Sequence, residues 1–187
     1  LGCASLFYLF LGLFYLRKFI FKFSSRAWIA LLVPILLFYG TPLFEFAINL
    51  NSLSHVYSFC VITVFTYYAF RFLNEEENKL YHFCLSLLLF AVLVSIRPLN
   101  ALVLLVLPAL ALHKNKFKGA TFMKPDFIHL MLMLFTVGVV ARQLYILKSA
   151  TGEFFPNTYS TEPFYFLSPR LIKAALGFQY GMFLYAP

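Results

Sequence analysis

Arg97 is the residue of this chain whose type and position are best suited to chemistry. It lies where two long apolar stretches meet, and Pro98 and Asn100 follow it. A guanidinium presents a rigid fork of N–H donors that fits a phosphate, and at a membrane boundary its long side chain reaches water at little cost. Pro98 fixes the backbone after it, and Asn100 adds a second polar side chain. On these residues alone, phosphate binding and a purely topological role for Arg97 are both open.

A carboxylate and an imidazole, Glu45 and His55, enclose a polar segment in the first third of the chain. Near a membrane interface, such a pair can do acid–base chemistry or bind a polar headgroup. The alternative is that both are solvated loop residues.

Near the C-terminus, the aromatic segment 163–170 ends in Arg170. We expect it either to lie along the membrane surface, with Arg170 and Lys173 reaching lipid phosphates, or to pack as a loop against the helices.

The composition indicates which elements must position these residues. Of 187 residues, 62% are hydrophobic and only 12% are charged, whereas a soluble domain carries roughly 25% charged residues. The apolar residues also form long unbroken runs, which are typical of helices buried on all sides or surrounded by lipid. The sequence therefore predicts an all-α, polytopic transmembrane helix bundle.

Six apolar runs predict about six spans. Several runs are shorter than the roughly 20 residues of a full span, although aromatic flanks and snorkelling Lys or Arg extend them. The fourth and fifth runs could instead form one region broken by a proline. We expect a bundle over residues 1–147 and an extracytoplasmic segment lying at the interface over 148–187. The six runs are 1–16, 27–39, 56–72, 81–96, 101–112 and 127–147.

The basic residues predict an orientation. Ten of the 15 Lys and Arg residues lie in three connections, 17–26, 71–80 and 113–126, and the net charge is +8. Because basic residues concentrate in cytoplasmic loops, these connections are expected in the cytoplasm. Residues 41–55 and 148–187 are then expected to face outward. Arg97, at the outer ends of the fourth and fifth runs, and His55, at the start of the third run, are expected on this same side. No basic stripe interleaved with aromatic residues is present, so a nucleic-acid partner is not expected.

Other signals are weak. Cys3, Cys60 and Cys84 lie within apolar runs without CxxC spacing, so we expect no metal ligands among them. The sequence identifies no cofactor and leaves a divalent metal open. Because the chain begins without Met and ends abruptly at Pro187, we expect it to be a fragment of a longer protein.

Three short motifs occur in an order and at a spacing similar to those of a group of bacterial polytopic proteins. They are GTPLF at 40–44, SHVYSF at 54–59 and IRPLN at 96–100, and the tail segments 166–170 and 181–187 also resemble that group. The group resembles the GT-C superfamily of integral-membrane glycosyltransferases, which includes the dolichyl-phosphate-mannose protein mannosyltransferases. The resemblance extends over residues 12–187.

This resemblance implies a multi-pass protein of the bacterial inner membrane that transfers a sugar from a polyprenyl-phosphate donor at the outer face. Its partners would be that donor, membrane lipids, and a glycan, lipid or protein acceptor. Arg97 matches the RP-x-N element of the group, where it would bind phosphate. Asn100, His55 and Arg170 are the other expected substrate-binding residues. The acidic catalytic base of such enzymes follows the first helix, so we expect it upstream of this chain and expect the chain alone to be inactive.

Two other readings stay open. A transporter or flippase of lipid-linked glycans would share the apolar helices, the boundary Arg residues and the aromatic belts. Inverted repeats or helices broken at the bilayer midplane would favour it, and the sequence has no internal repeat. A non-catalytic membrane scaffold is the second alternative.

Overall fold

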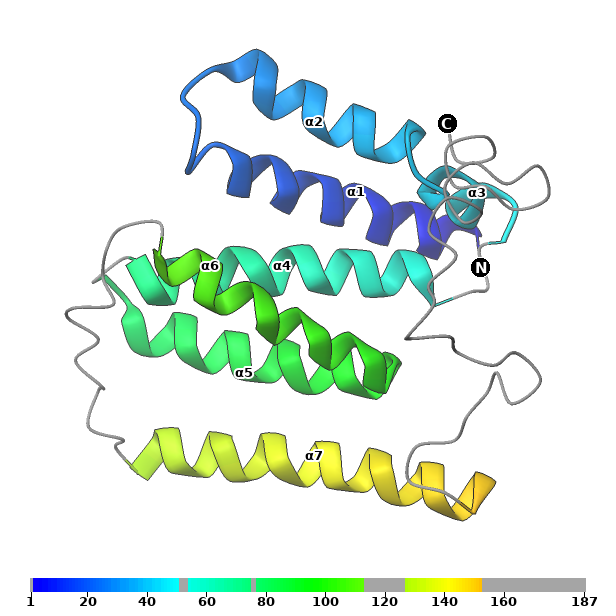
Figure 1. Cartoon of the computed structure of the whole chain (residues 1–187), viewed down its shortest axis with the longest axis vertical. Coiled ribbons are helices and arrows are strands. Elements are labelled where there is room, and N and C mark those ends of the chain that lie inside the picture. Colours follow the sequence, from blue (N-terminus) through cyan, green and yellow to red (C-terminus); the bar gives the residue numbers. More distant parts are fainter. Residues whose placement is uncertain (1, 51–53, 75–76, 113–126, 153–187) are drawn as a thin grey trace, which may run out of the picture.

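The computed structural model of the chain describes residues 2–50, 54–74, 77–112 and 127–152. All regular structure in these residues is helical (Figure 1), which confirms the predicted all-α bundle. The elements, in chain order, are α1 (Gly2–Ile20), α2 (Ala27–Tyr39), α3 (Leu43–Ile48), α4 (His55–Asn74), α5 (Lys79–Ile96), the 3₁₀ helix η1 (Pro98–Leu105), α6 (Val106–Leu112) and α7 (Phe127–Thr151).

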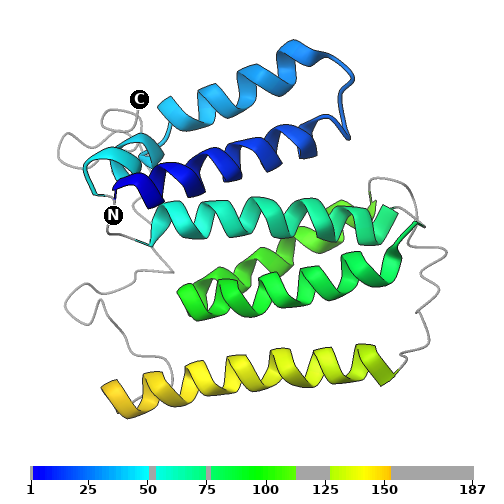
Figure 2. The ribbon, with the colours of Figure 1, turned by 180° about the vertical axis from the view of Figure 1, so that it is seen from behind.

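The long helices lie roughly side by side and alternate in direction along the chain (Figures 1 and 2). As a result, the chain connections gather at two opposite ends of the bundle. One end, which we call the α3 end, carries α3, the beginning of α4 and the junction of α5 with η1. The opposite end, which we call the basic end, carries the turn from α1 to α2, the end of α4 and the beginning of α5. The described connections, from α1 to α2 and from α4 to α5 at one end and around α3 and Arg97 at the other, are distributed as the sequence predicts. Which end faces the cytoplasm stays a prediction.

Helix α4 lies at the centre of the bundle, and it packs most extensively against α1 and α5. Half of an 18-residue stretch of α4 is buried, against 6% of such a stretch of α7. Two groups of buried apolar side chains surround α4. The first joins it to α1 and α3, and the second joins it to α5 and η1; their buried members are Leu9, Leu43, Ala47 and Val56, and Phe65, Ala69, Leu93 and Val103.

Gly12 allows α1 and α4 to approach each other closely. A Cβ atom at this position would lie 2.8 Å from Cε1 of Phe59 and 3.1 Å from Cα of Cys60. A small residue is therefore needed here, as is common where helices associate without a hydrophobic driving force between them.

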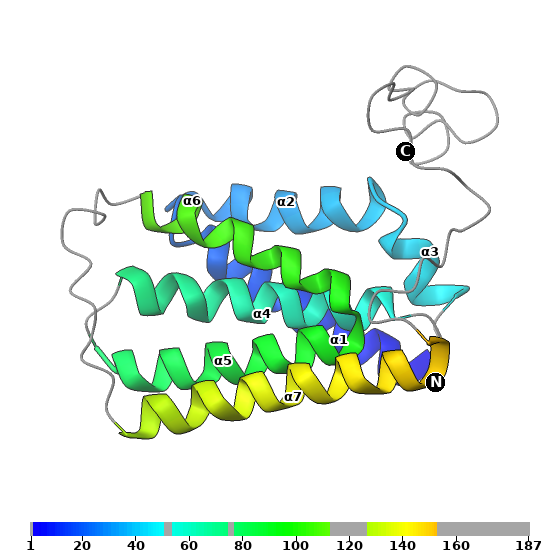
Figure 3. The ribbon, with the colours of Figure 1, turned by 60° about the horizontal axis from the view of Figure 1, so that its bottom comes forward.

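Within the described part of the chain, four helices are long and apolar enough to cross a membrane, by their length and composition: α1, α4, α5 and α7. Where two further spans are expected from the sequence, the structure has shorter apolar helices, Ala27–Tyr39 and Pro98–Leu110. At 1.5 Å per residue, the 13 residues of α2 extend over only about 20 Å, against the roughly 30 Å of a hydrocarbon core. Figure 3 shows η1 and α6 running obliquely past α4 and α5. The number of about six spans therefore stays a prediction.

Helix α7 continues to Thr151, past the expected boundary of the bundle at residue 147. The Oγ of Ser149 and the Oγ1 of Thr151 donate to backbone carbonyls of the preceding turn, those of Tyr145 and Leu147. Gly152 then ends the helix with a φ of 82°, a conformation that glycine adopts without strain, and its N–H donates to the carbonyl of Lys148. The remainder of the segment 148–187 lies outside the described residues.

Candidate functional site

Arg97 and His55 meet at the α3 end of the bundle. Nη1 of Arg97 lies 3.4 Å from Nδ1 of His55, although 42 residues separate them in the sequence. Because a guanidinium is only a donor, Nδ1 of His55 is the acceptor and the ring proton lies on Nε2. This contact confirms the expectation that both residues lie at the same end of the bundle. It engages one of the five N–H donors of Arg97, whose side chain is exposed.

The position of Arg97 follows from the proline after it. A residue before proline is driven out of the helical region by a clash with the pyrrolidine ring, and Arg97 accordingly has φ −152° and ψ 124°. Helix α5 therefore ends at Ile96, and η1 begins at Pro98. The guanidinium is thus carried by an extended residue between two helices, directed at the first residue of α4.

His55 is held in place by α3. Its ring stacks on that of Phe46, with the ring centroids 4.1 Å apart and the ring planes inclined by 17°. It is also the first residue of α4, where the N–H groups of the first helical turn have no partners within the helix and carry a partial positive charge. The imidazole is thus fixed between the ring of Phe46 on α3 and the guanidinium of Arg97, which lies between α5 and η1.

Asn100 joins the same group of residues through its side-chain amide. Its Nδ2 lies 3.1 Å from Oγ of Ser58 on α4 and 3.1 Å from the carbonyl oxygen of Leu93 on α5. Both amide hydrogens are therefore directed at protein acceptors, which ties the beginning of η1 to α4 and α5. The expected role of Asn100 in binding substrate is not tested by this geometry.

Glu45 lies in the first turn of α3, next to Phe46 in the chain. Its Oε2 accepts a hydrogen bond of 2.8 Å from Nδ2 of Asn49, and its side chain is exposed. The last expected binding residue, Arg170, lies outside the described residues, as does Lys173.

Arg97 and the beginning of α4 beside it favour an anion. The Arg97 guanidinium lies beside the amino-terminal end of α4, and both attract negative charge. Within the described ranges, no three His, Cys, Asp or Glu side chains are grouped closely enough to hold a metal ion. The Arg97 guanidinium beside the beginning of α4 is suited to binding a phosphate through N–H donors.

Two features of the described chain were not anticipated from the sequence. His82 on α5 is only 1% exposed, and its ring centroid lies 5.7 Å from that of Tyr68 on α4. Tyr68 in turn contacts α1, through a 3.3 Å hydrogen bond between its hydroxyl and that of Tyr15. Arg142 is a charged residue within α7. In the sequence, His82 and Arg142 stand out only as ionisable residues inside apolar runs. Such residues are rare in membrane helices and are a reason to suspect a function.

The described residues form a helical bundle with four helices of membrane-crossing length and, at one end, a group of polar residues around the cation of Arg97. No protein-family model, no curated protein and no solved structure matches the chain.

Proposed function

We propose that this chain belongs to a membrane glycosyltransferase that takes a sugar from a polyprenyl-phosphate donor at the extracytoplasmic face of a bacterial inner membrane. In this proposal Arg97 binds the donor phosphate, and His55 orients the guanidinium. The observation that carries the proposal is the contact of 3.4 Å between Arg97 and His55 beside the beginning of α4. The type of reaction, sugar transfer, is inferred from the resemblance of the RP-x-N and SHxYSF elements to those of the transferase group.

The electrostatics support a phosphate at this position. A phosphate can accept two parallel N–H bonds from one guanidinium, and the adjacent helix terminus adds a partial positive charge. The phosphate is the leaving group in sugar transfer, so a fixed cation that stabilises its developing charge lowers the barrier. The catalytic base remains unassigned, and Glu45 is not proposed for it.

The surface next to Arg97 supports a lipid-linked ligand. Leu99, Leu102 and Leu105 are 73%, 58% and 74% exposed. A 3₁₀ helix has three residues per turn, so residues three apart are aligned along one face. These leucines therefore form an apolar ridge that starts two residues after Arg97. We propose that the first isoprene units of the donor lie along this ridge while the phosphate faces the guanidinium.

Asn100 is proposed as a positioning residue. Its amide hydrogens point at Ser58 and at the carbonyl of Leu93, so its contribution is to hold η1, and with it Arg97, against α4. Arg170 remains proposed as a second phosphate-binding residue.

The proposal is tested by the binding of a polyprenyl phosphate to the purified chain in detergent. A hydrogen bond to a charged group is typically worth about 1.5–3 kcal/mol, so Arg97→Ala should weaken binding by roughly ten- to a hundredfold. Arg97→Lys keeps the charge but lacks the paired N–H donors of a guanidinium. Its affinity should therefore lie between those of the wild-type chain and Arg97→Ala. The matched control is Arg71→Ala, which removes a positive charge from the last turn of α4, at the opposite end of the bundle.

Unchanged binding by Arg97→Ala would reduce Arg97 to a topological anchor and remove the proposed site. A second measurement follows sugar transfer from the polyprenyl-phosphate donor by the full-length protein in membranes, at matched expression and subsaturating donor, because this chain alone is expected to be inactive. If Arg97 is needed for binding and no transfer occurs with any acceptor, a lipid-linked glycan transporter replaces the transferase.

A further inference from the structure

An apolar cavity lies between α1 and α2. It has a volume of about 300 Å³ and is lined by side chains of both helices, among them Phe10, Phe14, Leu31, Ile35 and Tyr39. This volume is at the lower end of the roughly 300–1,000 Å³ of ligand pockets. Along α2 the lining extends from Ala30 to Tyr39, which is about 14 Å of helix. We call it the α1–α2 groove.

The small volume of two α2 residues leaves this space open. Ala30 is fully buried and Pro34, inside the helix, is also buried, so neither fills the gap between the helices with a long side chain. The larger apolar residues border the space from both helices. A groove with these dimensions and this lining is suited to a hydrocarbon chain.

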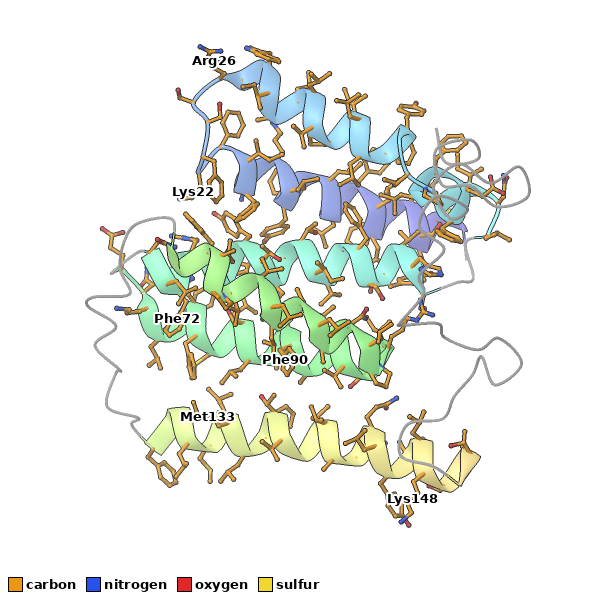
Figure 4. The ribbon with its side chains drawn as sticks, viewed as in Figure 1. Lys22, Arg26, Phe72, Phe90, Met133 and Lys148 are labelled. Carbon is orange, nitrogen blue, oxygen red and sulfur yellow. The ribbon has the colours of Figure 1, made fainter. Side chains whose placement is uncertain are left out.

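One end of the groove is positively charged. Arg17 is the single charged residue among its lining side chains, and it lies in the last turn of α1 together with Lys18. The Nζ of Lys18 lies 4.6 Å from the ring centroid of Phe14, which lines the groove. The turn that joins α1 to α2 adds Lys22 and Arg26 at the same end (Figure 4). Four basic residues therefore lie at this end of α1 and α2, and Arg17 among them lines the groove.

The geometry points to a binding site for one anionic phospholipid, with an acyl chain in the α1–α2 groove and the phosphate of its headgroup at Arg17. Charge complementarity selects this occupant. The lining is apolar along its length and cationic at one end only, which matches a chain with an anionic headgroup at one end. A zwitterionic phospholipid would fill the groove equally well but would bring a positive choline to the four cations.

This site is separate from the proposed donor site. Arg17 lies at the basic end of the bundle and Arg97 at the α3 end (Figure 1). Basic residues next to the cytoplasmic end of a span attract the anionic lipids of that leaflet. The expected occupant is therefore a resident membrane lipid that stabilises the pairing of α1 with α2, and the inference stands whether or not the donor site binds a polyprenyl phosphate.

The chain contains its own reporter for this site. Trp28 is its single tryptophan and is 58% exposed on α2. It precedes the groove residues Leu31 and Ile35 by three and seven positions, so it lies on the same face of the helix. Bromine atoms on an acyl chain quench tryptophan fluorescence on contact. Trp28 fluorescence therefore measures which lipid occupies the neighbouring surface.

The experiment titrates brominated phosphatidylglycerol against brominated phosphatidylcholine of the same chains, in bilayers containing the purified chain. We expect phosphatidylglycerol to be preferred by about fivefold, the factor that one basic residue near an anionic lipid contributes. Arg17→Gln should lower this preference toward one, and Arg17→Lys should keep most of it. Arg142→Gln removes a positive charge from α7 and should leave the preference unchanged.

A further variant separates the groove from general attraction to the basic end. Ile35→Phe narrows the groove while retaining all four cations, and should reduce the preference at least as much as Arg17→Gln does. Circular dichroism of each variant reports whether the helices remain folded. Equal quenching by the two lipids in the wild-type chain would overturn the inference. So would a preference that Ile35→Phe leaves intact, because the lipid would then be held by surface charge alone.

Discussion

Asn100 satisfies two acceptors on two helices with one amide group. Loss of its side chain would leave Oγ of Ser58 and the carbonyl of Leu93 without this donor. At the same junction, Arg97 and His55 meet through a contact that the sequence suggested only by the order of two motifs. The meeting of these two residues could be predicted from the alternating directions of the helices. In such a bundle, the beginning of α4 and the end of α5 lie at the same end of the bundle. The partners of Asn100 could not be predicted, since they depend on the 3₁₀ conformation of η1.

The contribution of Asn100 is tested with a double-mutant cycle. Asn100→Leu and Ser58→Ala should each lower the free energy of unfolding, because each removes one side of the 3.1 Å hydrogen bond. Their coupling energy should be about 0.6 kcal/mol, the average for hydrogen bonds between membrane helices, and at most about 1.7 kcal/mol. Unfolding by a denaturing detergent, followed by circular dichroism, gives the four free energies.

A matched control is Ser95→Ala. Ser95 donates to the carbonyl of Ala91 within its own helix, so its removal should have little effect and should not couple to Asn100→Leu. A coupling energy near zero between Asn100 and Ser58 would mean that the amide does not hold η1 against α4.

Helix α1 is held to its neighbours by small residues and one buried hydroxyl. Gly12 gives room for Phe59 on α4, and Oγ of Ser5 donates to the carbonyl of Ala47 on α3 over 2.9 Å. The sequence predicts that α1 is a helix because its residues are apolar throughout. It does not predict which face meets α4, since lipid-facing and protein-facing positions are equally apolar. The close approach at Gly12 is therefore a feature that only the three-dimensional arrangement reveals.

Replacing Gly12 tests this packing. Gly12→Ala places a methyl group within 3.1 Å of two residues of α4, so the helices must separate or rearrange. Overpacking of this kind costs about 1–3 kcal/mol, which corresponds to an apparent Tm lowered by roughly 2–10 °C. Thermal unfolding of the purified protein in detergent provides the measurement.

Gly138→Ala is the control at the level of the element. Gly138 lies in α7, and a Cβ atom there meets nothing within 4 Å among the described residues. Alanine also has the higher helix propensity, so the apparent Tm should stay constant or rise slightly. Equal Tm values for Gly12→Ala and the wild-type protein would show that α1 and α4 are not packed as closely as the structure has them.

Across the whole molecule, the unequal distribution of basic residues predicts one orientation. Among the described residues, the basic end holds six basic side chains: Arg17, Lys18, Lys22, Arg26, Arg71 and Lys79. Arg97 and Lys148 lie toward the α3 end, and Arg142 lies within α7. Figure 4 shows Lys22 and Arg26 at one end of the bundle and Lys148 near the other. The apolar runs predicted the helices well because each is interrupted by charge or proline. The number of spans could not be predicted as well, since α2 and η1 are apolar but short.

Cysteine labelling tests this orientation. In a background lacking Cys3, Cys60 and Cys84, Asn49→Cys at the α3 end should react with a membrane-impermeant thiol reagent added to intact cells. Ser25→Cys, in the turn before α2, should react only after the membrane is permeabilised. The opposite pattern would invert the topology and place the proposed donor site in the cytoplasm.

The shallow seating of α7 has a consequence for how this protein can change over time. Because, among the described residues, α7 packs chiefly against α5 and buries little of its surface, most of its positions should be constrained by hydropathy and hardly by shape. Substitutions among apolar residues should therefore accumulate freely along α7. They should be purged along α4, where neighbours on several sides fix the volume of each side chain. Related chains would then diverge fastest, among their apolar positions, in a helix that is long and apolar enough to cross a membrane.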